Sequence, residues 1–401
     1  MGKFDRRLGS DEVRSIFGIE IDDADLRAMD MSEPADLTRL ITKHSRHPTC
    51  GIRYLGSKLD ILPHIGKMIA GYDIHTAIDV FSGTTRVAQY FRQMGITVTT
   101  SDLSWATTAY AHTYVHNGDN HHLQAHIDAM NSVRRTVGWL TENYTGDTSQ
   151  TTATGMGRCF QMENAKKADA ALNYIHKQTS LTDWERYTLV TAVIHALDKV
   201  GNNVGMQQSY LKRWTPASYK NIDFKLPVCI KGAAGRHIEG DCLLAAANSR
   251  SPWLGTGGLY GRHDLAYVDP PYSPLAYSTY YHIWDSIVRW DKPTTALASR
   301  RRIDRVGIGN TMKSVWNVRG KAIVAFDILI ARLPARYVLI SYNDESIIDK
   351  DDLLLLSERH GTVKCETIEY QRNTMWNAVR DGRKVIKGQT NSELLILIDK
   401  G

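Results

Sequence analysis

The stretch from Thr76 to Leu103 places the strongest limit on how this chain folds, because it carries a strand, a helix and a second strand in close succession. An apolar strand runs into a small-residue turn as TAIDVFSG, and TRVAQYFRQMG follows as a helix that ends at Gly95. The β-branched segment ITVTTSDL then supplies the second strand. Such a unit joins parallel strands through a right-handed crossover. The sequence therefore predicts an α/β fold built on a parallel sheet.

Further strand signals occur only much later in the chain, at 264–271, 336–343, 363–370 and 393–400. Residues from about 105 to 230 are instead mostly helical in pattern, with clear segments at 122–144, 163–177 and 183–203. We therefore expect a helical insertion to interrupt the sheet. The predicted parts are an N-terminal arm (1–48), an α/β domain (49–118 and 236–401) and the insertion (119–235).

Composition is that of an ordinary globular protein, since 42% of the 401 residues are hydrophobic and 23% are charged. The net charge of +6 permits a polyanionic partner without requiring one. The five cysteines are scattered and form no Cys-x-x-Cys pair, which argues against a structural zinc site and favours a reducing cytoplasm. No long apolar stretch or leader-like segment is present, so we expect a cytoplasmic protein that does not contact a membrane.

The most specific motif is Asp269-Pro270-Pro271-Tyr272, which directly follows an apolar strand. Ligands of open parallel sheets bind at the carboxyl ends of the strands, where this motif is expected. The Asp269 carboxylate and the Pro270 carbonyl are two hydrogen-bond acceptors suited to orienting an amino group, and Tyr272 offers a ring on which a base can stack. The alternative interpretation is a proline-stiffened loop with a capping aspartate.

Two further segments stand out, of which the first is suited to binding a nucleoside. The turn from Asp79 to Thr85 contains Phe81 and Gly83, and Asp102 ends the next strand, where a carboxylate accepts hydrogen bonds from ribose hydroxyls. The complete glycine-rich phosphate motifs are missing, and an ordinary strand-to-helix turn is the alternative. The segment RYLGSK at 53–58 precedes a helical pattern, and it is alternatively just a helix N-terminus.

In this order, the motifs resemble those of the D12-class DNA adenine N6-methyltransferases, the family that includes the Dam enzymes, from about residue 52 to 400. The resemblance implies a Rossmann-like class I methyltransferase sheet, S-adenosyl-L-methionine as methyl donor, and no metal. It implies a catalytic motif of Asp269, Pro270, Pro271 and Tyr272, and cofactor contacts from Tyr54, Lys58, Phe81, Gly83, Asp102, Asp241 and Asp269. One departure is Thr85, which stands where the family usually has a second glycine.

The resemblance also implies a function, methylation of N6 of a flipped adenine in double-stranded DNA, in a bacterial or phage-encoded enzyme associated with the nucleoid. In the family's alpha motif order, the insertion between the cofactor and catalytic motifs recognises the target. Its lysines and arginines are candidate phosphate contacts or solvated charges, and Asn202, Asn203, Gln207 and Gln208 are candidate base readers or capping residues. Whether a cognate restriction endonuclease accompanies the enzyme stays open. The alternatives are an RNA adenine or cytosine-N4 methyltransferase, and a catalytically silent DNA-binding regulator.

Overall fold

The computed structural model describes residues 49–54, 56–116, 118–146, 159–203, 205–207, 210–211, 213–248, 261–271, 277–295, 302, 314–343, 346–371 and 390–401. The predicted N-terminal arm and the side chain of Tyr272 lie outside these residues. Within them, no helix is both long enough and apolar enough to cross a membrane.

Within the described ranges, seven strands form one sheet in the order β3-β2-β1-β4-β5-β7-β6. Their bounds are β1 (Thr76–Asp79), β2 (Thr97–Asp102), β3 (Arg236–Glu239), β4 (His263–Val268), β5 (Ala335–Asn343), β6 (Thr362–Gln371) and β7 (Thr390–Asp399). The strands from β3 to β5 run parallel, whereas β7 is antiparallel to both β5 and β6. The fold is therefore mixed α/β.

The strand order changes direction between β1 and β4, since β2 and β3 lie on one side of this pair and β5 on the other. In open α/β sheets, such a switch point opens a crevice at the carboxyl ends of the strands. Asp79 is paired with Tyr267, so the chain leaves β1 and β4 at the same edge of the sheet. The two motifs that follow these strands, 190 residues apart in sequence, are thereby brought side by side.

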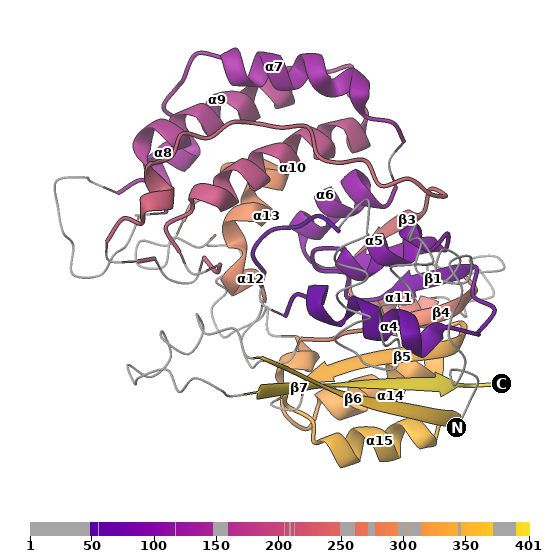
Figure 1. The fold of residues 1–401 in the computed structure, drawn as a ribbon. Helices are drawn as coiled ribbons and strands as arrows, with labels where there is room; N and C mark the ends of the chain where they lie inside the picture. Colours follow the sequence, from indigo (N-terminus) through magenta and orange to yellow (C-terminus); the bar gives the residue numbers. More distant parts are fainter. Residues whose placement is uncertain are drawn as a thin grey trace, which may run out of the picture.

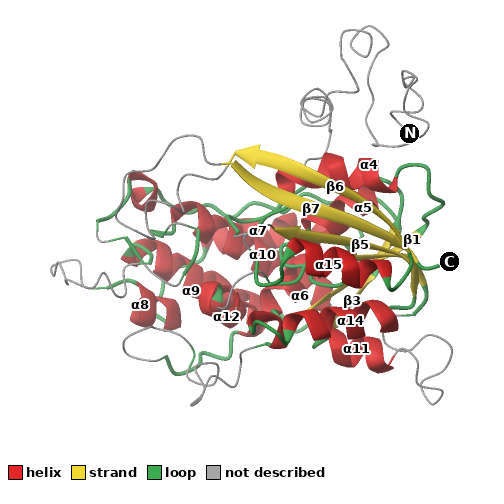
Figure 2. Cartoon of the chain, turned by 90° about the horizontal axis from the view of Figure 1, so that it is seen from below, coloured by secondary structure: helices red, strands yellow, loops and turns green. Residues whose placement is uncertain are grey.

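Helices cover both faces of the sheet (Figures 1 and 2). One core cluster joins the sheet to α4 (Leu62–Ile69), α5 (Arg86–Gln93), α6 (Trp105–Tyr114) and α13 (His282–Arg289). The second joins it to α11 (Cys242–Asn248), α14 (Ala322–Arg332) and α15 (Lys350–Glu358). Strand β5 supplies Tyr337 and Leu339 to the first cluster and Val338 and Ile340 to the second, as the period-two geometry of a strand requires.

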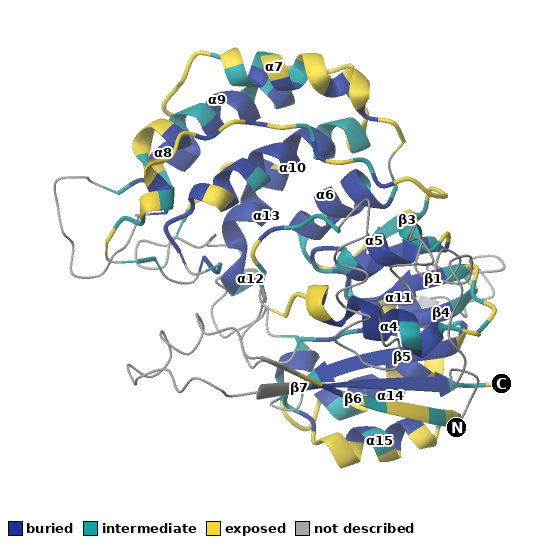
Figure 3. Ribbon diagram, viewed as in Figure 1, coloured by how far each residue is buried: buried dark blue, intermediate teal, exposed yellow. Residues whose placement is uncertain are grey.

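The remaining helices are mostly those of the predicted insertion. They are α7 (Gln124–Ser132), α8 (Trp139–Tyr144), α9 (Met162–Lys177), α10 (Asp183–Val200) and α12 (Tyr277–Tyr280), with the 3₁₀ turns η1 (Leu59–Ile61), η2 (His121–Leu123), η3 (Pro216–Tyr219) and η6 (Val315–Asn317). Helices α7 to α10 lie together, away from the sheet, and α10 packs against α6 and α13 (Figure 1). Accordingly, α10 is largely buried while the outermost α7 shows exposed positions (Figure 3).

The predicted strands are confirmed at the expected places, and so are the helices at 163–177 and 183–203, except that α10 ends at Val200. Three features differ from expectation. The segment 122–144 forms two helices, α7 and α8, rather than one, and residues 220–230 are irregular rather than helical. Strand β3 was missed because its four residues, RHIE, are exposed or half-buried at the sheet edge and have no apolar pattern.

Candidate active site

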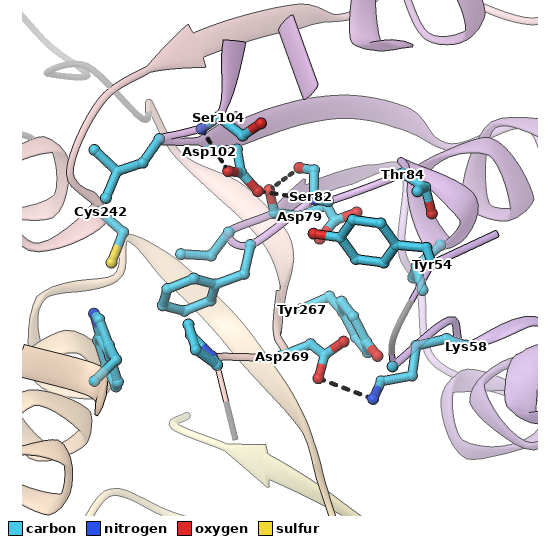
Figure 4. A pocket seen from close by; sticks show the side chains of 18 of the residues that line it. Tyr54, Lys58, Asp79, Ser82, Thr84, Asp102, Ser104, Cys242, Tyr267 and Asp269 are labelled. Carbon is cyan, nitrogen blue, oxygen red and sulfur yellow. Dashed lines mark hydrogen bonds and ion pairs between the residues drawn. The ribbon is translucent and has the colours of Figure 1, made fainter. Parts of the chain in front are cut away.

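One pocket lies over the switch point of the sheet, and most of the predicted site residues line it (Figure 4). Those lining it are Tyr54, Lys58, Phe81, Gly83, Asp102, Asp241, Asp269 and Pro271. Asp102 with Ser104 lies at one end of the pocket, and Asp269 with Lys58 lies at the other. Pro270 is buried beside Asp269, and Tyr272 lies outside the described residues.

Asp102 organises the turn that follows β1. Its Oδ2 accepts a hydrogen bond from the Gly83 amide at 2.9 Å, and its Oδ1 accepts one from the Ser104 amide at 2.8 Å. Burial raises the pKa of Asp102 to about 6, although these two amides act to lower it. Gly83 has a φ of +48°, and a Cβ there would lie 3.3 Å from the Tyr54 ring. The turn therefore favours glycine at this position.

Thr85 adopts the left-handed conformation, with φ of +61° and ψ of +16°. A β-branched residue is strained there, which explains why glycine suits this position. Its hydroxyl accepts a hydrogen bond from the Gln89 side chain at 3.1 Å, and its neighbours Thr84 and Arg86 form the pocket wall. The Cβ of Thr85 is thus accommodated in the interior against α5.

Asp79 lines the pocket, although the sequence motifs predicted no role for it. It ends β1, it is 1% exposed, and its Oδ1 has no hydrogen-bond partner among the described residues. Burial raises its pKa well above the usual range, and the nearby Asp269 and Asp102 carboxylates add to the effect. An acid at the last position of the strand before the turn was the available signal. Its unpaired oxygen favours a ligand that donates a hydrogen bond or carries positive charge.

Asp269 forms a buried ion pair with Lys58, whose Nζ lies 3.1 Å from Oδ1 (Figure 4). The same Nζ lies 2.9 Å from Oε1 of Glu393 on β7. Burial alone would lower the pKa of Lys58, but the two carboxylates outweigh it and raise the pKa. Burial raises the pKa of Asp269 to about 7, with Lys58 opposing this effect and Glu393 adding to it. No sequence motif singled out Glu393.

Aromatic rings form other parts of the wall. Tyr54 stacks on Tyr281 with ring centroids 4.3 Å apart, which connects the segment before α4 with the segment that follows Asp269 and Pro270. Phe81 meets Trp316 edge to face at 5.1 Å. Asp241 accepts from the Leu243 amide at 2.9 Å and so caps the start of α11.

Three of the four candidate base readers of the insertion form hydrogen bonds inside the protein. Asn202 accepts from the Thr215 amide at 3.0 Å, and Asn203 accepts from the Gly205 amide at 2.9 Å. Gln207 accepts from the Ile283 amide at 2.7 Å at the start of α13. All three are buried, so the structure favours the capping interpretation for them. Gln208 lies outside the described residues.

Among the candidate phosphate contacts, three cations also have partners within the protein. Lys167 donates to the Ile222 carbonyl at 2.9 Å, and Lys166 pairs with Glu163 at 2.9 Å. Arg186 donates to two carbonyls at the end of α9. Lys199 and Arg213 are exposed, and Lys212 lies outside the described residues.

The chain is similar in sequence to one protein family and to several methyltransferases. The family model for D12 class N6 adenine-specific DNA methyltransferases matches residues 54–237 and 258–353. The modification methylase StsI of Streptococcus sanguinis is 26% identical over 87% of this chain and 52% of its own length. The modification methylase LlaI of Lactococcus lactis subsp. lactis is 26% identical over 87% of this chain and 55% of its own length. The type II methyltransferase M.NlaIII of Neisseria lactamica is 23% identical over 87% of this chain and 99% of its own length.

The chain therefore spans about half the length of the StsI and LlaI relatives and nearly all of the third. The family match covers the segments that supply both ends of the pocket, from Tyr54 through Asp102 to Asp269. From this match over most of its length, the chain belongs to the D12 class N6 adenine-specific DNA methyltransferase family.

Proposed function

We propose that this protein transfers a methyl group from S-adenosyl-L-methionine to N6 of adenine in double-stranded DNA. The observation that carries the proposal is the pocket at the switch point, which joins the Asp102 turn to the Asp269 motif in one continuous wall. Family membership supports the same reaction. We further propose that the sheet is a Rossmann-like class I methyltransferase sheet, supported by the strand order and by the antiparallel β7.

The residues of the pocket fit S-adenosylmethionine. The wall is rich in carboxylates, namely Asp79, Asp102, Asp241, Asp269 and Asp285, which suits a cationic ligand that donates hydrogen bonds and does not suit a phosphate. The Oδ1 of Asp79, buried without a partner among the described residues, is assigned to the ammonium group of the cofactor. We assign the ribose hydroxyls to Asp102, the cofactor's adenine to the Phe81 and Asp241 region, and contacts along the wall to Tyr54, Lys58 and Gly83.

For catalysis, we assign the orientation of the adenine amine to Asp269 and to the carbonyl of Pro270. The N6 lone pair is delocalised into the ring, so acceptors on its hydrogens are needed to direct it toward an electrophile. When bound, S-adenosylmethionine supplies that electrophile, a methyl group on a sulfonium. The Asp269 side chain is only 15% exposed, and partial exclusion of water strengthens its hydrogen bonds. Pro271 stiffens the motif, and Tyr272 is assigned the stacking surface for the flipped base.

The proposal is tested by incubating the purified protein with labelled S-adenosylmethionine and DNA from a methylation-free bacterium. The expected product is N6-methyladenine at a defined sequence, mapped by long-read sequencing. Transfer to RNA or to cytosine N4 instead would identify a different substrate. DNA binding without any transfer would identify a silent regulator.

Removing the Asp102 carboxylate should weaken cofactor binding. Asp102→Ala takes away a charged acceptor and also frees the Gly83 and Ser104 amides that shape the turn. We expect a loss of about 1.5–3 kcal/mol in S-adenosylmethionine binding, measured by calorimetry. Asp119→Ala, which removes an exposed acid, is the control and should bind normally. Unchanged affinity in Asp102→Ala excludes this residue from the cofactor site.

We propose that the insertion over 119–235 recognises the DNA target. It supplies helices α7 to α10, which pack beside the pocket-bearing sheet through α6 and α13. Replacing it with the corresponding segment of the Neisseria lactamica relative should move methylation to a new site, as mapped by sequencing. A folded, active chimera that keeps the original site shows that recognition lies elsewhere in the chain.

A further inference from the structure

Glu393 is an unusual residue for its position in the sheet. It lies on β7, which is hydrogen-bonded to β5 on one side and β6 on the other, and the residues that follow it, Leu394 to Ile398, are all buried and apolar. Glu393 itself is 2% exposed. A carboxylate buried this deeply costs several kcal/mol of desolvation unless charged or polar groups meet it.

Two donors converge on a single oxygen of this carboxylate. Oε1 of Glu393 lies 2.9 Å from the Lys58 ammonium and accepts the hydroxyl hydrogen of Ser341 at 2.6 Å. Ser341 is on β5, in register with Leu395 of β7, so the backbone ladder sets this contact. Lys58 comes from the segment just before η1. The Glu393 carboxylate is therefore fixed by a hydrogen bond from a neighbouring strand. It in turn binds a lysine from a distant part of the chain.

Lys58 connects Glu393 with the proposed active site. Its ammonium contacts Oε1 of Glu393 and Oδ1 of Asp269, and both Lys58 and Asp269 line the pocket. A lysine with one carboxylate partner would be drawn to that partner alone. With two, its position between them is defined, and one oxygen of Asp269 is held at a set distance. Precise orientation of this kind matters because small misplacements at a reacting centre are expensive.

We propose that Glu393 is a positioning residue which, through Lys58, holds Asp269 in the orientation that methyl transfer requires. The inference rests on the proposed function and adds to it a residue from β7, outside the motifs. Glu393 does not touch the reacting atoms. Its effect reaches the substrate amine only through the ammonium of Lys58 and the carboxylate of Asp269.

The charges around Asp269 give this role a measurable signature. Lys58 favours the ionised form of Asp269, whereas the Glu393 carboxylate opposes it, and among the described residues Asp79 and Tyr267 also face this site. Asp269 must be ionised to accept from the amine, so activity should fall as the pH drops through its pKa. Glu393 raises that pKa. Neutralising Glu393 should therefore lower the pKa and move the acid limb of the pH profile to lower pH.

The experiment is the isosteric change Glu393→Gln in the full chain, assayed by labelled methyl transfer to DNA. We expect kcat to fall about tenfold or more because Lys58 then interacts more strongly with Asp269 and weakens it as an acceptor. KM for DNA should stay close to the wild-type value. The acid limb of the kcat profile should move by about one pH unit to lower pH. Ser341→Ala, which removes the hydroxyl that donates to Glu393, should lower kcat in the same direction and by less.

Glu366→Gln is the matched control. Glu366 is on the neighbouring strand β6 and pairs with His64 and Lys67 of α4, so it is also a strand glutamate that contacts a segment near Lys58. Its neutralisation should leave kcat and the acid limb unchanged. A Glu393→Gln protein that loses thermal stability but keeps the wild-type kcat and acid limb overturns the inference and leaves the proposed function intact. A wild-type protein without methyl transfer to any DNA overturns the proposed function itself.

Discussion

Replacing Asp269 with alanine is expected to lower kcat for methyl transfer by a factor of about 10²–10³ or more, while DNA binding stays close to wild type. The variant removes the charged acceptor that we assign to the adenine amine. Glu393 still partners Lys58 at 2.9 Å, so the buried ammonium keeps a carboxylate and the protein should fold. The measurements are single-turnover transfer of labelled methyl groups and a fluorescence titration with DNA.

Asp264→Ala is the control for this change. Asp264 lies near the start of β4, the strand that ends immediately before Asp269. Its carboxylate accepts from the His75 and Thr76 amides at 2.9 and 2.8 Å and secures the start of β1. The control should lower the free energy of unfolding and keep kcat. Near-normal turnover in Asp269→Ala would refute the assigned mechanism, and an equal loss in both variants would indicate a general structural defect.

The sequence predicted the positions of several pocket residues because these residues stand at the carboxyl ends of strands. Asp102 and Asp269 each follow a clear apolar or β-branched strand, so the parallel sheet required by the first crossover places them at one edge. Asp79 has the same signal, yet the role proposed for it depends on an oxygen that is buried without a partner among the described residues. That property arises from tertiary packing and cannot be predicted from the amino-acid sequence of the turn.

Glu393 could not be predicted, for a different physical reason. It stands in the run ELLILI, where a single acid at the start of an apolar strand normally marks the point at which the strand emerges into solvent. Here the hairpin of β6 and β7 continues past this position, and β5 brings Ser341 against it. The contact depends on strand register and on a lysine about 335 residues earlier, so no local pattern contains it.

Polar residues in the insertion illustrate the converse. Asn202, Asn203 and Gln207 resemble base readers by residue type, but each is buried and accepts a backbone amide. The backbone N–H of Gln207 also donates a hydrogen bond to the Tyr280 carbonyl at 2.7 Å. Gln207, which follows α10 in the chain, is thereby connected to α12 and α13. These two helices come shortly after Asp269 and Pro270 in sequence. Residue type alone did not distinguish surface recognition from internal capping.

Removing the cation between the two buried carboxylates is expected to produce the largest loss of stability. Lys58→Met leaves Asp269 and Glu393 without their shared ammonium partner, and breaking a buried ion pair in this way costs about 3–5 kcal/mol. Burial raises the pKa of Asp269, and the lysine that opposes this shift is gone, so the folded state binds a proton at Asp269 more tightly than the unfolded state. The destabilisation is therefore greatest at high pH and is relieved as the pH falls. Urea unfolding at pH 5 and pH 8, read out by circular dichroism, measures this difference.

The double variant Lys58→Met/Glu393→Gln separates stability from catalysis. Neutralising Glu393 removes one of the two uncompensated charges, so the double variant should be more stable than Lys58→Met alone and should depend less on pH. Methyl transfer should stay low in both variants because Asp269 still lacks the ammonium that positions it. Strictly additive losses of stability would mean that Lys58 and Glu393 are not coupled. Recovery of kcat together with stability would mean that Lys58 acts only on folding, so that the orientation of Asp269 does not depend on it.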